Sequence, residues 1–289
     1  MEELHTTESR TEASSEIIRV PSATGDLRLH PFHSRTFRNN RFLRVWLPPG
    51  YDDPENASRR YPVLYLNDGQ NLFEASTAFG GVEWGVDETA DRLIREGTIP
   101  PMMIVGLDNA GKNRIREYMP HRSLQPMILR VQGSRYPVFL MKEVMPYVAR
   151  NYRVATGAEN TGLGGSSLGA LIALYTASVR PGVFGRLLLE SPSLWASNRQ
   201  SIRDSRLVKL WPERIFLATG TAEAGREDRD RSVVDDVREF AATLRRCGLD
   251  DQRLRIVIED GAAHNEASWA RRFPEALSFL FGRPASASQ

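Results

Sequence analysis

The sequence predicts an α/β fold in which a mostly parallel sheet carries helices on both faces. Short runs rich in β-branched and apolar residues alternate with longer segments of helical period, as in chains built from strand–helix–strand units. The apolar runs are also continuous, which is typical of strands that are buried on both faces. The expected strands are 42–47, 63–66, 102–107, 161–165, 186–189, 215–218 and 255–259.

Five segments between and after these strands have the period of a helix. In the segment 168–179, apolar side chains recur three and four residues apart, which gives the helix one face that can pack on the sheet. The expected helices are 87–95, 138–151, 168–179, 233–247 and 266–281. The stretch 108–138 has no clear period and is long for a loop, so we expect it to help shape a pocket.

Composition excludes several classes of protein. The 289 residues include 38 Lys and Arg against 36 Asp and Glu, and this near balance argues against a nucleic-acid partner. Hydrophobic residues make up 41% of the chain, as in an ordinary globular protein. The apolar runs are far shorter than the roughly 18 residues of a membrane span. The single cysteine, Cys247, cannot form an internal disulfide or a thiolate metal cage.

The two ends of the chain differ from its interior. Residues 1–16 are polar, with five Glu and Arg10 as the one Lys or Arg, which is the opposite of a signal peptide. We therefore expect a disordered N-terminal tail and a cytoplasmic location. Residues 283–289 lack an apolar period, which predicts a flexible C-terminal tail. Without repeats or a linker in between, residues 17–282 are expected to form one domain.

One segment has the pattern of a nucleophile on a tight turn. Gly165, Ser167 and Gly169 form a G-x-S-x-G sequence between an expected strand and an expected helix. Such a turn brings the backbone so close together that side chains at the flanking positions would clash, which explains the glycines. The pattern selects Ser167 rather than Ser166. The alternative is a glycine-rich turn that only packs closely.

A serine hydroxyl needs a base to take its proton, and the usual base is a histidine oriented by a carboxylate. Of five histidines, only His264 follows Ser167, as the order nucleophile, acid, histidine requires. His264 also lies in a loop directly after the last expected strand. An exposed histidine without a role is the alternative.

The acid is expected between these two residues. Glu223 comes soon after the strand 215–218, and functional groups of open α/β sheets gather at the carboxyl ends of strands. Asp228 and Asp230 are rivals, although they lie in a charged run, 226–231, that is more typical of a solvated loop. We expect Glu223 to be the acid.

The negative oxygen of an acyl-transfer intermediate requires two backbone N–H donors. Leu168, directly after the nucleophile, supplies one donor. The other is expected after the strand 63–66, where Gly69 lets the backbone turn and Gln70 presents its amide.

Several of these segments together resemble the putative esterase family of α/β-hydrolases, which includes esterase D, enterochelin esterases, feruloyl esterases and mycolyltransferases. The resemblance covers most of the chain and includes, in order, VWLPPGY (45–51), YPVLYLNDGQNLF (61–73), REYMP (116–120), the elbow at 165–169, SPSLW (191–195), GTAE (220–223) and HNE (264–266). It implies an α/β-hydrolase fold for residues 17–282. In the family, the residue after Asp-Gly donates to the oxyanion, and this position is Gln70 here.

The resemblance also marks differences and further candidates. Asn67 stands where many relatives have His or Leu, and residues 52–60 form a polar insertion that we expect to be a surface loop. Trp84 and Trp195 resemble positions near the family's acyl or leaving-group pocket, and either could equally belong to the core. We expect no cofactor, and no metal because His, Asp and Glu show no ligand spacing.

The predicted function is hydrolysis of a carboxylic ester by a serine hydrolase, through an acyl-enzyme on Ser167. We expect a small-molecule substrate with a short or aromatic acyl group, because residues 190–214 are too few for a large lid. The resemblance implies that the acyl group is carried by a sugar or a siderophore in some members of the family. An acyltransferase that uses the same intermediate is one alternative. Another is a catalytically idle scaffold that binds carbohydrate or protein. The oligomeric state is left open.

Overall fold

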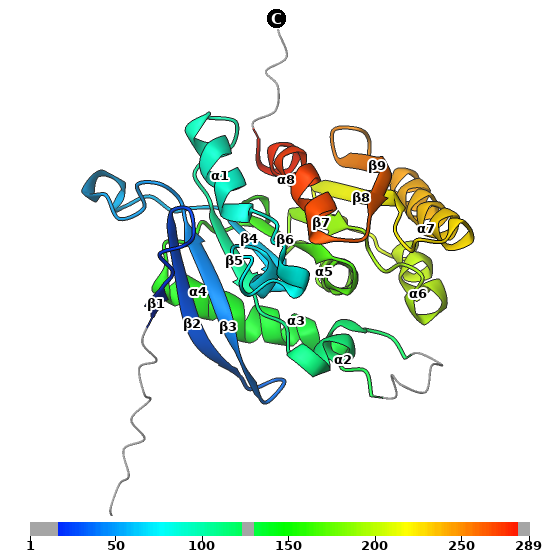
Figure 1. Ribbon diagram of the computed structural model, residues 1–289, viewed down its shortest axis with the longest axis horizontal. Helices are drawn as coiled ribbons and strands as arrows, with labels where there is room; N and C mark the ends of the chain where they lie inside the picture. Colours follow the sequence, from blue (N-terminus) through cyan, green and yellow to red (C-terminus); the bar gives the residue numbers. More distant parts are fainter. Residues whose placement is uncertain (1–16, 123–129, 283–289) are drawn as a thin grey trace, which may run out of the picture.

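A computed structural model describes residues 17–122 and 130–282, and in this part of the chain nine strands form one sheet. The strand order is β1-β2-β3-β5-β4-β6-β7-β8-β9 (Figure 1). The strands β5, β4, β6, β7, β8 and β9 run parallel to one another, whereas β1, β2 and β3 each pair antiparallel with the next strand in this order. The bounds are β1 (Ile18–Arg19), β2 (Asp26–Ser34), β3 (Asn39–Leu47), β4 (Val63–Asn67), β5 (Met103–Leu107), β6 (Thr161–Ser166), β7 (Arg186–Glu190), β8 (Arg214–Ala222) and β9 (Leu254–Ala263). The predicted mostly parallel sheet is confirmed.

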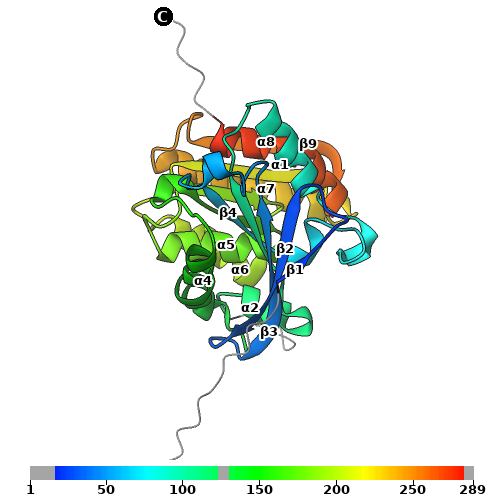
Figure 2. The same ribbon diagram turned by 90° about the vertical axis from the view of Figure 1, so that its left-hand side faces the viewer.

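Helices cover both faces of this sheet. α1 (Val86–Arg95) and α8 (Glu266–Phe281) pack on one face, where they share a core cluster with β4 and β5 (Figures 1 and 2). The other face is covered by α2 (Arg114–Tyr118), α3 (Tyr136–Phe139), α4 (Met145–Asn151), α5 (Leu168–Val179), α6 (Ala196–Ser205) and α7 (Glu227–Arg246). A π-helical turn, Leu140–Val144, joins α3 to α4, so the helix expected at 138–151 is continuous.

Burial explains which strands the sequence predicts. Every residue of β4, β5 and β7 is buried, and these strands are the continuous apolar runs. The hairpin strand β2 was not predicted, because it lies near the antiparallel edge, is only partly buried and is rich in polar residues.

The helices differ from prediction in three ways. α2 forms within the stretch 108–138, where no helix was predicted. The run 226–231 is not a loop, because α7 begins at Glu227 and its acidic first turn suits the positive end of a helix. α6 was not predicted, and three of its residues, Ser197, Asn198 and Arg199, have left-handed backbone angles that break the helical period.

The topology gathers the predicted site residues at one edge of the sheet. Because β4, β6, β8 and β9 are parallel, the segments after their carboxyl ends lie along the same edge. Residues 52–60 are almost all exposed, as expected for a surface loop, and residues 190–214 contain no helix beyond α6. The predicted tails, 1–16 and 283–289, lie outside the described residues.

Candidate active site

Ser167 occupies the strained turn between β6 and α5. Its φ of 56° and ψ of −125° are unusual for a residue with a side chain. A Cβ added at Gly165 would lie 3.0 Å from the carbonyl carbon of Gly169, and one added at Gly169 would lie 2.8 Å from Oδ2 of Asp68. The two glycines are therefore required by close approach.

The hydroxyl of Ser167 is half-buried, and its Oγ lies 3.4 Å from Oγ of Ser193. The Ser167 amide donates to the carbonyl of Glu190 at the end of β7 at 2.9 Å. The structure shows no hydrogen bond between Ser167 and His264, although both are in the described part of the chain. Catalytic hydrogen bonds are often long before substrate binds, so the turn is compatible with a later contact.

Glu223 and His264 are brought together at the ends of β8 and β9. Oε2 of Glu223 forms a short hydrogen bond with Nδ1 of His264. The Glu223 side chain is 2% exposed and the His264 side chain 35%, so the acid is enclosed while the imidazole faces the solvent. A carboxylate at Nδ1 favours the tautomer whose Nε2 is free to accept a proton.

The other carboxylate oxygen of Glu223 is also well satisfied. Oε1 accepts from the Gly220 amide at 2.6 Å and from Oγ of Ser191 at 2.7 Å. Burial raises the pKa of Glu223, but the hydrogen bonds from His264, Ser191 and Gly220 outweigh burial and hold this pKa below its usual value. Glu223 is therefore ionised at neutral pH.

Neither rival acid reaches the histidine. Asp228 is exposed and pairs with Arg226, and Oδ1 of Asp230 accepts from the Ala224 amide at 2.5 Å. Both side chains belong to the first turn of α7. Of the three candidates, only Glu223 contacts His264.

The turn after β4 lies against the start of α5. Asp68 has a left-handed φ of 60°, and Gly69 packs so tightly on β5 that a Cβ would lie 2.7 Å from the backbone of Gly106. Nδ2 of Asn67 donates to the carbonyl of Gly169 at 2.7 Å, which joins this turn to the elbow. The side chain of Asn67 therefore connects the turn after β4 to the elbow at Ser167. No role for this side chain was predicted.

The amides of Gln70 and Leu168 are placed on these two joined segments. Within residues 17–122 and 130–282, neither N–H has a hydrogen-bond acceptor. Free amides at a helix start and on an adjacent turn can donate to a developing negative oxygen.

Polar side chains from the stretch 108–138 support the turn. The guanidinium of Arg114 binds both carboxylate oxygens of Asp68, at 2.7 and 2.8 Å, and Asn109 donates to the same carboxylate at 2.7 Å. Residues 123–129 of this stretch lie outside the described part. The family-like motif includes Asp68, but no sequence pattern marked Asn109 or Arg114, because their pairing with Asp68 depends on the fold.

Asn71 connects the turn to the histidine side of the site. Its Nδ2 donates to Oε1 of Glu266 at 3.0 Å, and its Oδ1 accepts from the Phe79 amide at 3.0 Å. Glu266 is the first residue of α8 and comes two residues after His264. The only available signal was that Asn71 is a polar residue within a family-like motif.

The two tryptophan candidates lie in different surroundings. Trp84 is 3% exposed and its ring packs 5.7 Å from that of Trp269, so the structure supports the core alternative for this residue. Trp195 is 55% exposed and comes two residues after Ser193, the neighbour of Ser167. Of the two, only Trp195 is accessible to a ligand.

Residues 17–122 and 130–282 show neither a metal-ligand cluster nor a membrane-spanning helix. No group of three His, Cys, Asp or Glu side chains in these ranges could hold a metal ion. Within the same ranges, no helix is both long enough and apolar enough to cross a bilayer.

The doubly covered parallel sheet, the strained serine after β6 and the buried acid bonded to a histidine define the class of α/β hydrolases. The family model described as "Putative esterase" matches residues 34–280. The chain therefore belongs to the putative esterase family, and its enzyme class is that of the carboxylic ester hydrolases.

Individual relatives are distant in sequence. The chain is 25% identical over 253 residues to uncharacterized protein YbbA of Bacillus subtilis, covering 86% of this chain and 95% of that protein. It is 24% identical over 265 residues to an endo-1,4-beta-xylanase/feruloyl esterase of Xylanibacter ruminicola, covering 89% and 31%. It is 29% identical over 234 residues to an iron(III) enterobactin esterase of Dickeya dadantii, covering 75% and 47%.

Solved structures share the fold. The BES protein from Bacillus cereus aligns with a TM-score of 0.71 at 17% identity and covers 96% of this chain and 99% of its own. The enterobactin esterase FES from Shigella flexneri, crystallised with enterobactin, aligns with a TM-score of 0.69 at 19% identity, covering 88% and 58%.

Proposed function

We propose that the protein hydrolyses a carboxylic ester through an acyl-enzyme intermediate on Ser167, with His264 as the base and Glu223 as the acid that orients it. The observation that carries this proposal is the hydrogen bond between His264 and the buried, ionised Glu223 at the sheet edge that also holds the elbow. This arrangement is the one that activates a serine hydroxyl.

The first half of the reaction forms the acyl-enzyme. Oγ of Ser167 attacks the acyl carbon while Nε2 of His264 takes the hydroxyl proton, and the carbonyl oxygen becomes an oxyanion. The amides of Gln70 and Leu168 donate to that oxyanion. When the tetrahedral intermediate collapses, the ester C–O bond breaks and the imidazolium gives its proton to the leaving alkoxide.

The second half releases the acid. A water molecule attacks the acyl carbon, His264 takes the water proton, and the bond to Ser167 Oγ breaks as that oxygen regains a proton from the imidazolium. Glu223 stabilises the imidazolium that forms in both halves, because its carboxylate is ionised and lies at Nδ1. Transfer to an alcohol would follow the same steps, with the alcohol in the place of water.

The proposed substrates are esters of short or aromatic acids. The exposed ring of Trp195 near Ser193 offers a flat apolar face to an aromatic acyl group or a sugar ring. Residues 190–214 contain only α6, which is too little to enclose a long acyl chain. Similarity to proteins named as feruloyl and enterobactin esterases is compatible with this class.

The test is a panel of acetyl, butyryl, benzoyl, feruloyl and palmitoyl esters, assayed with and without an added alcohol. We expect the acetyl or aryl esters to have the highest kcat/KM and Ser167→Ala to lower kcat by about 10⁴-fold or more. Ser166→Ala is the matched control and is expected to have a mild effect. A preference for palmitoyl esters would contradict the substrate class, and an equal loss in Ser166→Ala would contradict the choice of Ser167.

A further inference from the structure

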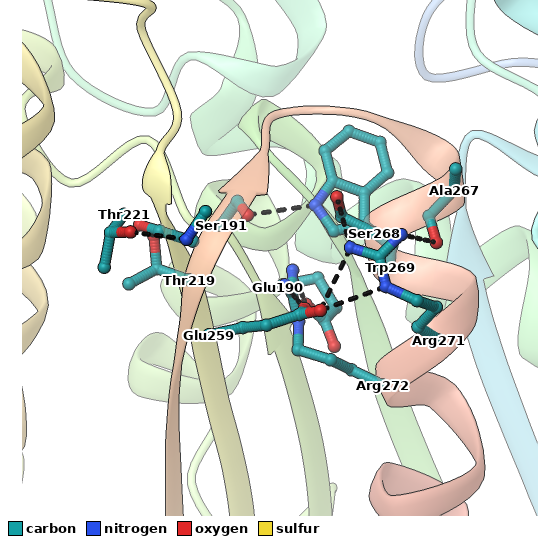
Figure 3. A network of polar contacts seen from close by, with 12 residues as sticks. Glu190, Ser191, Thr219, Thr221, Glu259, Ala267, Ser268, Trp269, Arg271 and Arg272 are labelled. Carbon is teal, nitrogen blue, oxygen red and sulfur yellow. Dashed lines mark hydrogen bonds and ion pairs between the residues drawn. The ribbon is translucent and has the colours of Figure 1, made fainter.

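Ser191 is a buried residue with an unusual backbone directly after β7. It is 2% exposed and has a φ of 43°, in the region that favours glycine. Its Oγ lies 2.7 Å from Oε1 of Glu223 and 2.9 Å from Nε1 of Trp269, and Figure 3 shows the bond to Trp269. A residue that adopts a strained conformation and makes two buried hydrogen bonds beside an acid is a candidate for a positioning role.

The chemistry of these groups determines the direction of both hydrogen bonds. An indole N–H can only donate, and an ionised carboxylate can only accept. The Ser191 hydroxyl therefore accepts from Trp269 and donates its one proton to Glu223. Because the indole occupies a lone pair of Oγ, it also polarises the O–H bond toward the carboxylate.

Ser191 differs from the other donors to the same carboxylate oxygen. The Gly220 amide and the Thr219 hydroxyl belong to β8, the strand that leads into Glu223 itself. Among the described residues, Ser191 is the donor to Oε1 that comes from a different element. It therefore ties the acid to β7, whose last residue, Glu190, also holds the Ser167 amide.

Trp269 contacts His264 directly and is linked to Glu223 through Ser191. Its ring packs edge-on against that of His264, with centroids 5.2 Å apart at 85°, while its N–H reaches Ser191. Three residues further along α8, Arg272 binds Glu190 at 2.8 and 2.9 Å (Figure 3). α8 is thus bonded to two consecutive residues at the end of β7.

We propose that Ser191 and Trp269 are positioning residues that hold the Glu223 carboxylate in the orientation in which Oε2 faces His264. This inference rests on the proposed function, because positioning matters for a rate only if the pair acts on Ser167. The relevant side chains around the carboxylate are His264, Ser191 and Thr219, with the Glu190–Arg272 ion pair behind Ser191.

Two variants separate the hydrogen bonds from the packing. Ser191→Gly suits the positive φ and removes the hydroxyl, so it deletes the hydrogen bonds to Glu223 and Trp269 without adding backbone strain. Trp269→Phe keeps an aromatic ring beside His264 and removes the N–H. Trp84→Phe is the matched control, because Trp84 is equally buried, packs on Trp269 and has an N–H without a partner among the described residues.

We expect Ser191→Gly to lower kcat about 10- to 100-fold, as the loss of a hydrogen bond to a charged group does, with KM changed less than about 2-fold. Trp269→Phe should lower kcat about 3- to 10-fold, and Trp84→Phe should stay within about 2-fold of the wild type. The second readout is the low-field proton resonance of the His264–Glu223 hydrogen bond, which should move in both test variants and stay in place in the control.

The resonance is measured on the resting protein, so it separates this inference from the proposed function. If Ser167→Ala stays active, the proposed function fails, while the resonance still reports whether Ser191 and Trp269 position Glu223. If Ser191→Gly does not fold, Trp269→Phe carries the same comparison. The inference is overturned if either folded variant keeps both the kcat and the resonance of the wild type, or if Trp84→Phe changes them as much as Trp269→Phe does.

Discussion

The proposed acid–base half of the site and the proposed nucleophile half are held in place by different interactions. Glu223 and His264 are held by side-chain hydrogen bonds and ring packing from β7, β8 and α8. Ser167 and the turn before Gln70 depend on the backbone as well, with positive φ values of 56° and 60° and glycines at the points of closest approach, and Arg114 and Asn67 add side-chain hydrogen bonds to the turn.

The two kinds of support predict how each half should respond to substitution. A side-chain network loses one hydrogen bond at a time, so changes around Glu223 should reduce the rate in graded steps. A backbone packed at contact distance cannot admit even one methyl group, so changes near Ser167 should act through displacement of the amides. The largest effect, however, should come from the residue that is proposed to transfer protons between the two halves.

That residue is His264, and His264→Ala should lower kcat by about 10⁴-fold or more, because the nucleophile and its base fail together. The fold should be unchanged, since the imidazole is partly exposed. Steady-state kinetics on the best short ester measures the effect, with His33→Ala, another exposed histidine, as the control. A loss of less than about 100-fold would separate the two halves and contradict a shared role.

Glu223→Gln should follow, with kcat lowered about 10³- to 10⁴-fold, because an amide no longer stabilises the imidazolium. Asp228→Asn and Asp230→Asn should be close to the wild type, since neither carboxylate contacts His264. The same kinetic assay ranks the three variants. If Asp228→Asn were the most damaging, the acid would have to be moved five residues along the chain.

Gly169→Ala tests the backbone half and should lower kcat about 10²- to 10³-fold, the usual effect of losing one oxyanion donor. Its Cβ would collide with Oδ2 of Asp68, which Arg114 holds in place, and would push the Gln70 turn away from α5. Gly97→Ala is the control for backbone strain without a clash, because Gly97 has a φ of 71° but a Cβ there meets no atom within 4 Å. Wild-type kcat in folded Gly169→Ala would show that the turn does not act through close packing.

Trp195→Ala should have a smaller effect, because it changes substrate binding and not the contacts that support either half. We expect it to raise KM for aryl esters about 3- to 10-fold with little change in kcat. The ring is 55% exposed and belongs to neither set of supporting contacts. The comparison of aryl and acetyl esters measures it, because only the aryl KM should change. Equal changes in both would argue that the ring acts on the fold.

The smallest effect concerns stability and pH. The pKa of Glu223 is lowered in the folded protein, so its ionised form stabilises the fold above the pKa of the unfolded chain, near 4.3. This contribution is lost as the pH falls through the folded value. The free energy of unfolding of the wild type should therefore exceed that of Glu223→Gln at pH 7, and urea titrations should show the difference shrinking below about pH 4. A difference that grows toward low pH would contradict the sign.

Much of the fold could be predicted because its central strands are continuous apolar runs. β4, β5 and β7 are buried on both faces and stand out in the sequence, whereas β2 is partly exposed and has no such signal. α6 was not found because its left-handed residues break the helical period on which the prediction depends.

The proximity of Glu223 to His264 could be predicted from chain order and from the strand ends that precede the two residues. The residues that support them could not. Ser191 and Trp269 are 78 positions apart, and Asn71 and Glu266 are 195 apart, so each pair meets only because β7, β4 and α8 converge at one edge. A polar residue in an apolar context indicates a buried partner but does not identify it.

The reactivity of Ser167 can be tested most directly with a fluorophosphonate, which phosphonylates a serine hydroxyl only when a neighbouring base activates it. We expect one adduct per chain, mapped by peptide mass spectrometry to Ser167, with no labelling in Ser167→Ala and strongly slowed labelling in His264→Ala. An unmodified wild-type protein, or an adduct on Ser166 or Ser193 in its place, would contradict an activated nucleophile at Ser167.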